Sequence, residues 1–121
     1  MMKKETVLTN GCFDILHIGH IRLFEFCKTL GNELIVLLNS DKSIKLLNKA
    51  KERPINKEQE RFEILSSIKF IDKIIIFEEV NPCKLISEIQ PQYYVKGGDY
   101  KIKDLPESEI VLGYGGEIRI F

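Results

Sequence analysis

The sequence has no excess of charge of either sign, because 18 lysines and arginines balance 18 aspartates and glutamates. A nucleic-acid surface needs a basic patch, so we expect no nucleic-acid partner and expect any phosphate to be held by a local site. The chain also has no apolar run long enough to span a membrane. Residues 1–5 are charged with no apolar segment behind them, so we expect no signal peptide, no membrane partner and a cytoplasmic location.

Cysteine is scarce, and the spacing of Cys12, Cys27 and Cys83 fits neither a disulfide framework nor a zinc site. We interpret the three as reduced thiols of a cytoplasmic protein and expect no metal held by the protein itself. The sequence has no repeat, linker or low-complexity tract. With 121 residues, 44% hydrophobic and 30% charged, it has the length and composition of one globular domain, 1–121.

Strand-like and helix-like patterns alternate along the whole chain. The run 34–38 is unbroken Leu-Ile-Val-Leu-Leu, which is typical of a parallel strand covered on both faces. The alternation predicts a Rossmann-like, doubly wound parallel sheet of five strands in a single α/β/α domain. The expected strands are 6–9, 33–39, 73–77, 92–95 and 117–121.

Helices are expected between these strands, and capping residues predict where some begin and end. The first, 18–30, stops at Gly31. Asn56 is predicted to cap a helix whose buried face carries Phe62, Leu65 and Ile68, with Gln59 completing a variant capping box. Asn81 is predicted to cap a helix that starts at Pro82 and ends near Ile89. Shorter helices are expected at 42–48 and 106–112.

Both histidines of the chain, His17 and His20, lie three residues apart where the first strand gives way to a helix. At that spacing they should face the same way from the helix N-terminus. Free N–H groups, a glycine and two imidazoles at such a position suit a phosphate chain. The alternative is that these histidines are ordinary cap or surface residues.

Three loops follow the expected strands and should converge on one cleft at their carboxyl ends: 10–20, 39–41 and 96–100. Displacement at a phosphate needs positioning and charge compensation, for which His17, His20, Arg61 and the lysines after the second strand have the right chemistry. The plainer interpretations are a solvated basic face at 42–53, a tight turn at 96–99 and a surface ion pair for Arg61. Cys12 has no evident base, which disfavours a nucleophilic role.

The run at 9–20, Thr-Asn-Gly-Cys-Phe-Asp-Ile-Leu-His-Ile-Gly-His, contains the His-x-Gly-His signature of the cytidylyltransferase-like nucleotidyltransferase superfamily. Together with four further motifs it resembles bacterial heptose 1-phosphate adenylyltransferases, which make ADP-heptose for lipopolysaccharide. The similarity spans nearly the whole chain, and Lys-Gly-Gly-Asp-Tyr differs from the corresponding part of glycerol-3-phosphate cytidylyltransferases. The four motifs are Leu-Asn-Ser-Asp at 38–41, Arg-Pro-Ile-Asn at 53–56 with Arg61 following, Val-Lys-Gly-Gly-Asp-Tyr at 95–100 and Tyr-Gly-Gly at 114–116.

The resemblance implies binding of ATP, with Mg²⁺ carried by its triphosphate, and transfer of AMP to a sugar 1-phosphate with release of pyrophosphate. It implies that His17, His20 and Arg61 contact phosphate, with one lysine among Lys45, Lys49 and Lys51. The sugar phosphate attacks in line, so no nucleophilic side chain is needed. The nucleotide site would be formed by Thr9, Asn10, Gly11, Cys12, Phe13, Asp14, Gly19, Asn39, Lys96, Gly97, Gly98 and Asp99.

The sequence departs from the family pattern in two places. The run 47–53 is one residue longer than usual before Arg-Pro and has no glycine, which leaves the choice among the lysines open. The family continues into a Ser-Thr-Thr segment that opens a final helix, whereas this sequence stops at Phe121. We therefore expect a domain without that helix. The alternatives are that its activity is low, that the sequence is a shortened form, or that another chain supplies the missing contacts. We expect the protein to be a homodimer.

Two other functions stay open at this point. One is a cytidylyltransferase acting on a polyol phosphate such as glycerol 3-phosphate. The other is a nucleotide-binding module with little catalytic activity. In either enzyme the partners would be a nucleoside triphosphate and a small phosphorylated sugar or polyol.

Overall fold

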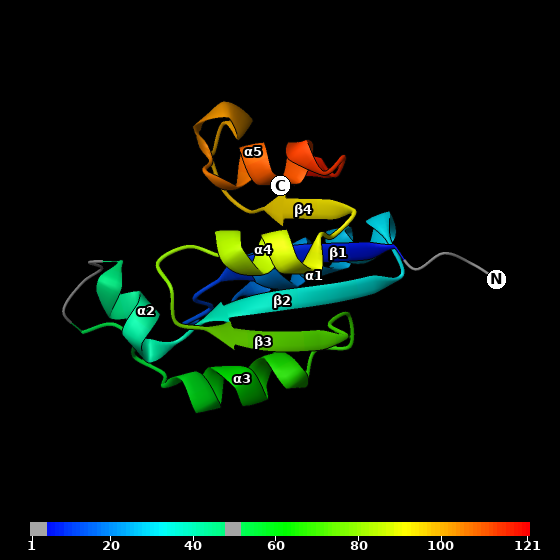
Figure 1. Ribbon diagram of the computed structural model, residues 1–121. Helices are drawn as coiled ribbons and strands as arrows, with labels where there is room; N and C mark the ends of the chain where they lie inside the picture. Colours follow the sequence, from blue (N-terminus) through cyan, green and yellow to red (C-terminus); the bar gives the residue numbers. More distant parts are fainter. Residues whose placement is uncertain (1–4, 48–51) are drawn as a thin grey trace.

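The computed structural model describes residues 5–47 and 52–121, and its centre is a parallel sheet of five strands in the order β3-β2-β1-β4-β5 (Figure 1). The Rossmann-like fold predicted from the sequence is thereby confirmed. The strands are β1 (Thr6–Gly11), β2 (Glu33–Asn39), β3 (Lys73–Phe77), β4 (Tyr93–Lys96) and β5 (Glu117–Ile120).

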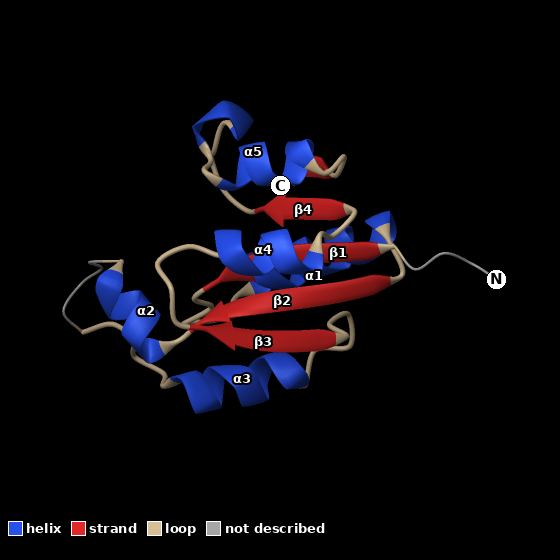
Figure 2. Cartoon of the chain, in the orientation of Figure 1, coloured by secondary structure: helices blue, strands red, loops and turns tan. Residues whose placement is uncertain are grey.

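Helices follow the strands on both faces of the sheet (Figure 2). They are α1 (Ile18–Leu30), α2 (Asp41–Leu46), α3 (Glu58–Ser66), α4 (Cys83–Ile89) and α5 (Glu107–Gly113), with one 3-10 turn at Ile102–Asp104. The predicted bounds are correct for α1, β2 and β3, whereas β1 is two residues longer than expected and β4 lies one residue later. None of the helices in the described ranges is long and apolar enough to cross a membrane.

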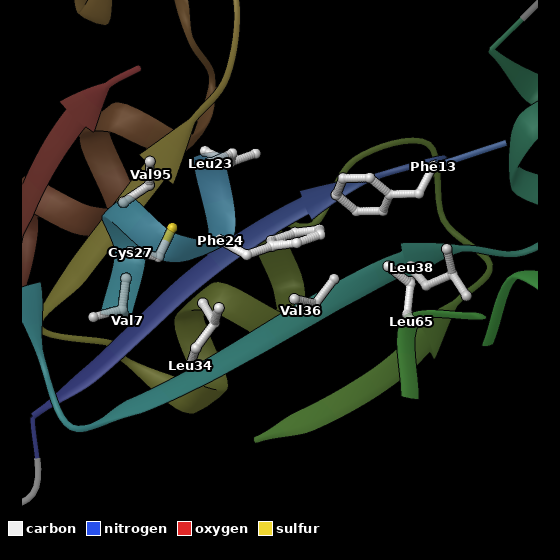
Figure 3. Close-up of a cluster of buried hydrophobic side chains, with 10 residues drawn as sticks. All are labelled: Val7, Phe13, Leu23, Phe24, Cys27, Leu34, Val36, Leu38, Leu65 and Val95. Carbon is white, nitrogen blue, oxygen red and sulfur yellow. The ribbon is translucent and has the colours of Figure 1, made fainter. Parts of the chain in front are cut away.

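The core consists of two apolar clusters, one on each face of the sheet. Phe24 and Cys27 of α1 and Leu65 of α3 pack on the first face, where Figure 3 shows them beside side chains of β1, β2 and β4. Ile86 of α4 and Val111 of α5 pack on the second face. Alternate residues of the central strand β2 enter the two clusters, which explains its unbroken apolar sequence.

The predicted cap of α3 is wrong. The helix begins at Glu58 after Lys57, which makes no side-chain cap hydrogen bond, and Asn56 instead donates from Nδ2 to the Asp14 carbonyl at 2.6 Å. The cap comes from α2, because the Glu58 N–H donates to Asp41 Oδ1 at 2.9 Å and the Asp41 N–H donates to Glu58 Oε1 at 2.9 Å. The first turns of the two helices therefore cap each other, a pairing that local sequence cannot reveal.

The predicted start of α4 is also one residue early. Pro82 precedes the helix, and the Asn81 carboxamide oxygen accepts a hydrogen bond from the Cys83 N–H at 3.1 Å. Asn81 thus still satisfies a free N–H group at the start of the helix, as the sequence suggested, but from a position two residues before it.

The order of the strands reverses at β1, which pairs with β2 on one side and β4 on the other. In Figure 1 the arrows of the labelled strands point the same way, so their carboxyl ends lie at one end of the sheet, and α2 lies beyond that end. Connections leave the two neighbouring strands in opposite directions at such a point, so a crevice opens at their carboxyl ends.

Candidate functional site

A cleft of about 1230 Å³ lies at the carboxyl ends of the strands. Segments far apart in the sequence meet there, namely 10–20 after β1, Asn39 at the end of β2 and 96–98 after β4. The predicted convergence of the three loops is therefore present in the structure. Two further segments contribute to the wall, 80–82 after β3 and 104–107 at the start of α5.

The two histidines form the N-terminal cap of α1 with their own ring nitrogens. His17 Nδ1 accepts from the Gly19 N–H at 3.0 Å, and His20 Nδ1 accepts from the His17 N–H at 3.2 Å. The rings stack with 3.9 Å between their centroids. Because each Nδ1 is an acceptor, a neutral ring carries its proton on Nε2, so the two imidazoles together offer two N–H donors. From the sequence, a helix cap and a position facing a ligand were alternatives for these histidines. In the structure His17 and His20 both cap α1 and line the cleft.

Burial favours the neutral form of His20. It lowers the pKa of His20 below the ordinary imidazole value, and the charge of the adjacent His17 lowers it further. The ring also meets the edge of Phe13, whose centroid is 5.2 Å away. His20 is therefore a neutral hydrogen-bond donor near pH 7, and its Nδ1 stays available for the cap.

Gly19 is required by the close approach of the His17 ring. A Cβ atom at this position would lie 2.8 Å from Cε1 of the imidazole, which is closer than real contacts allow. Gly11 is crowded in the same way by the ring of Phe13, at 2.9 Å. The Phe13 backbone has φ +47°, an uncommon conformation that turns the chain from β1 toward α1 while its ring packs on Phe24.

Asp14 lines the cleft, but its carboxylate binds the protein itself. It accepts hydrogen bonds from the N–H groups of Ile55 and Asn56, both at 2.8 Å, and from Arg53 Nη1 at 2.9 Å. Burial alone would raise its pKa, but these bonds outweigh burial and hold the pKa of Asp14 below its usual value. The carboxylate therefore fastens 53–56 to the loop after β1.

Replacing Asp14 by asparagine should lower the free energy of unfolding by about 1–3 kcal/mol near pH 7, because the carboxamide cannot accept all of these bonds. A carboxylate with a lowered pKa stabilises the fold above its unfolded pKa of about 3.9, and this stabilisation is lost as the pH falls through the folded value. The difference between the proteins should therefore shrink below about pH 4. Urea titrations from pH 3 to 8 measure it, with the exposed Asp99→Asn as control. A difference independent of pH would contradict this role.

Arg61 is not among the residues that line the cleft, and the alternative that it lies on the surface is wrong. Its side chain is completely buried. Nη1 donates to the Cys12 and Asn39 carbonyls at 2.9 and 2.6 Å, and Nη2 pairs with Asp41 at 2.8 Å. Nε donates to the carbonyl of Asn56 at 2.8 Å. The guanidinium thus joins the ends of β1 and β2 to the starts of α2 and α3.

Two other predicted residues, Thr9 and Asp99, are also not among the residues that line the cleft. Thr9 is buried, and its hydroxyl donates to the Val95 carbonyl at 2.8 Å, joining β1 to β4. Asp99 is exposed beyond the lining residues. Lys49 lies outside the described residues, as does Lys51, whereas Lys45 is exposed in the last turn of α2.

The remaining predicted residues do line the cleft. Asn10 is oriented by a hydrogen bond from the Tyr94 hydroxyl, and Asn39 donates to Ser43 Oγ at 2.9 Å. The ammonium of Lys96 lies 4.9 Å from the centroid of the Tyr100 ring. The predicted residues on the wall are Asn10, Gly11, Cys12, Phe13, Asp14, His17, Gly19, His20, Asn39, Lys96, Gly97 and Gly98.

Sequence reasoning missed three charged residues of the wall, Arg53, Asp104 and Glu107. The side chain of Arg53 is partly exposed. Its position in the Arg-Pro-Ile-Asn motif at 53–56 could have identified it as a candidate site residue. Glu107 is almost completely buried at the start of α5, and nothing in the local sequence separates it from the other glutamates.

The fold and this cleft together define a Rossmann-like α/β protein with an open cleft at the switch point of its sheet. The sequence profile of the cytidylyltransferase-like family matches residues 8–116. The chain therefore belongs to the cytidylyltransferase-like family, and the resemblance drawn from its motifs is confirmed.

Two curated relatives are both named bifunctional protein HldE. The protein from Campylobacter concisus is 49% identical over 109 residues, and that from Geotalea uraniireducens is 44% identical over 117 residues. These matches cover 90% and 97% of this chain but only 23% and 24% of the relatives. The chain thus spans about a quarter of their length.

Solved structures show the same fold. The lipopolysaccharide core biosynthesis protein from Thermoplasma volcanium superposes with a TM-score of 0.80 at 30% identity, covering 98% of each chain. Pantothenate synthetase from Thermus thermophilus superposes with a TM-score of 0.68 at 16% identity, covering 98% of this chain and 55% of the other. At that identity the second match shows the fold alone.

Proposed function

We propose that this chain is a nucleotidyltransferase that moves a nucleoside monophosphate from a triphosphate to a phosphorylated acceptor. The observation that carries the proposal is the pair of stacked imidazoles, His17 and His20, whose Nδ1 atoms are used in the helix cap and whose Nε2–H donors are left for a ligand. Membership of the cytidylyltransferase-like family supports the same reaction class.

In this mechanism the acceptor phosphate attacks the α-phosphorus of the triphosphate in line, and the bond to the leaving pyrophosphate breaks. The two Nε2–H donors stabilise the charge that grows on the non-bridging oxygens, and the α1 N-terminus adds to the same field. Lys96 and Arg53, both on the wall of the cleft, supply positive charge for the outer phosphates. Mg²⁺ enters with the triphosphate as part of the substrate.

The donor and acceptor we propose are ATP and a heptose 1-phosphate. The names of the relatives support this choice, since the chain resembles HldE and a lipopolysaccharide core biosynthesis protein. The motif at 95–100, which forms the β4 end of the cleft, points to the same group. The family includes cytidylyltransferases, so CTP with a polyol phosphate is the second candidate.

Pyrophosphate release measured with each nucleoside triphosphate and each acceptor tests the proposal. We expect release with ATP and heptose 1-phosphate under Mg²⁺, and at least about tenfold less with CTP or glycerol 3-phosphate. Faster release with CTP would favour the second candidate. ATP binding without release for any pair would instead identify a nucleotide-binding module with little catalytic activity.

A further inference from the structure

The wall of the cleft contains a buried carboxylate, one oxygen of which lacks a hydrogen-bond partner in the part of the chain that the structure describes. Glu107 is 3% exposed, and its Oε2 atom accepts no hydrogen bond from any described residue. It is also close enough to Cys83 and Tyr94 for its charge to raise the pKa of both groups, after the larger effect of burial. A buried acceptor without a donor destabilises a fold, so an oxygen in this position calls for a donor from outside.

The cleft has two chemically different halves. On the α1 side lie the histidines and Gly97, which faces Leu23 of that helix. Imidazole donors and a closely approaching backbone suit a phosphate chain. The triphosphate therefore fits this half.

The other half is formed by α4, α5 and the loops before them, and its polar groups are Glu107, Asp104 and Asn81. Carboxylates repel phosphate but accept hydrogen bonds from hydroxyl groups. We propose that Glu107 binds the hydroxyl groups of the acceptor and so selects a sugar phosphate over a simple phosphate ester. This proposal rests on the function proposed above, because it assumes that the cleft takes a second, hydroxyl-bearing substrate.

Isothermal titration of the protein with heptose 1-phosphate and, separately, with ATP and Mg²⁺ tests the assignment. Glu107→Ala should weaken heptose 1-phosphate at least about tenfold, since a hydrogen bond to a charged group is lost, and change ATP affinity less than about twofold. Glu107→Gln, which keeps one carbonyl acceptor, should have a smaller effect. Glu109→Ala, on the same helix but exposed, is the matched control and should change neither affinity.

The same variants distinguish ligand binding from a structural role. A residue kept for the fold would lower Tm when replaced, whereas removing an unpartnered buried charge should leave Tm unchanged or raise it. Equal heptose 1-phosphate affinity in the wild type and Glu107→Ala, loss of ATP affinity instead, or no wild-type binding of heptose 1-phosphate would each overturn the assignment. Titration needs no turnover, so absent pyrophosphate release would refute the proposed function and leave this result standing.

Discussion

His17→Asn and His20→Ala should each lower the turnover number about 10²- to 10³-fold, because each removes one preorganised donor to the charge that develops at the α-phosphate. Asparagine is chosen at position 17 because it is a strong N-cap and can accept the Gly19 N–H in place of Nδ1. Steady-state pyrophosphate release and circular dichroism melting, measured on the same samples, separate catalysis from folding.

Gly19→Ala tests the position of the ring rather than its chemistry. Both histidines are kept, but the new methyl group would displace the His17 imidazole, which lies 2.8 Å from the Cβ position. We expect turnover to fall at least about tenfold with little change in Tm, because the better helix propensity of alanine, about 1 kcal/mol, offsets the loss of the His17 cap, also about 1 kcal/mol. Near-normal turnover in both histidine variants would contradict the mechanism, whatever the glycine variant shows.

Arg61→Ala should lower the free energy of unfolding by about 3–5 kcal/mol, because it removes a buried guanidinium, its ion pair with the partly exposed Asp41 and the donor of three carbonyl groups. The carbonyls belong to Cys12, Asn39 and Asn56, which lie in three segments that surround the cleft. Such a change is a large fraction of the stability of an average domain. Urea denaturation followed by circular dichroism measures it.

Arg61→Lys gives the sharper comparison, since it keeps the charge but loses the planar fork that reaches four acceptors. We expect it to lie between the wild type and Arg61→Ala in stability. The exposed Arg22→Ala on α1 is the matched control and should change the free energy of unfolding by less than about 0.5 kcal/mol. If Arg61→Ala kept full stability and lost only turnover, Arg61 would act on phosphate as first predicted.

The histidine motif was the part of the site that sequence reasoning could find, because its signal is local. The cap of α1 is formed by His17, Gly19 and His20, which lie within three positions of one another in the sequence. The predicted Asn56 cap is wrong because the actual cap of α3 comes from a residue distant in the sequence. A local pattern predicted a cap, but the N–H of Glu58 found a stronger acceptor in Asp41, 17 positions away.

Arg61 also shows the difference between what local sequence predicts and what tertiary packing decides. The sequence identified it as a residue of interest, and both the resemblance and the plainer interpretation placed it where a phosphate or water could reach it. Only the packing of β1, β2, α2 and α3 around one point decides that its guanidinium is enclosed. Burial of a charge depends on several segments at once, and no periodicity in a single helix encodes it.

The sequence by itself determined the alternation of strands and helices, the parallel sheet and the place of the histidines, since apolar periodicity and turn chemistry act over a few residues. The tertiary structure alone decided which charged groups face the cleft. The side chains of Asp14 and Arg61 bind other segments of the protein. Arg53 and Glu107 line the cleft. The physical reason is that desolvation and hydrogen-bond satisfaction depend on contacts between residues distant in the chain, which exist only after the sheet has formed.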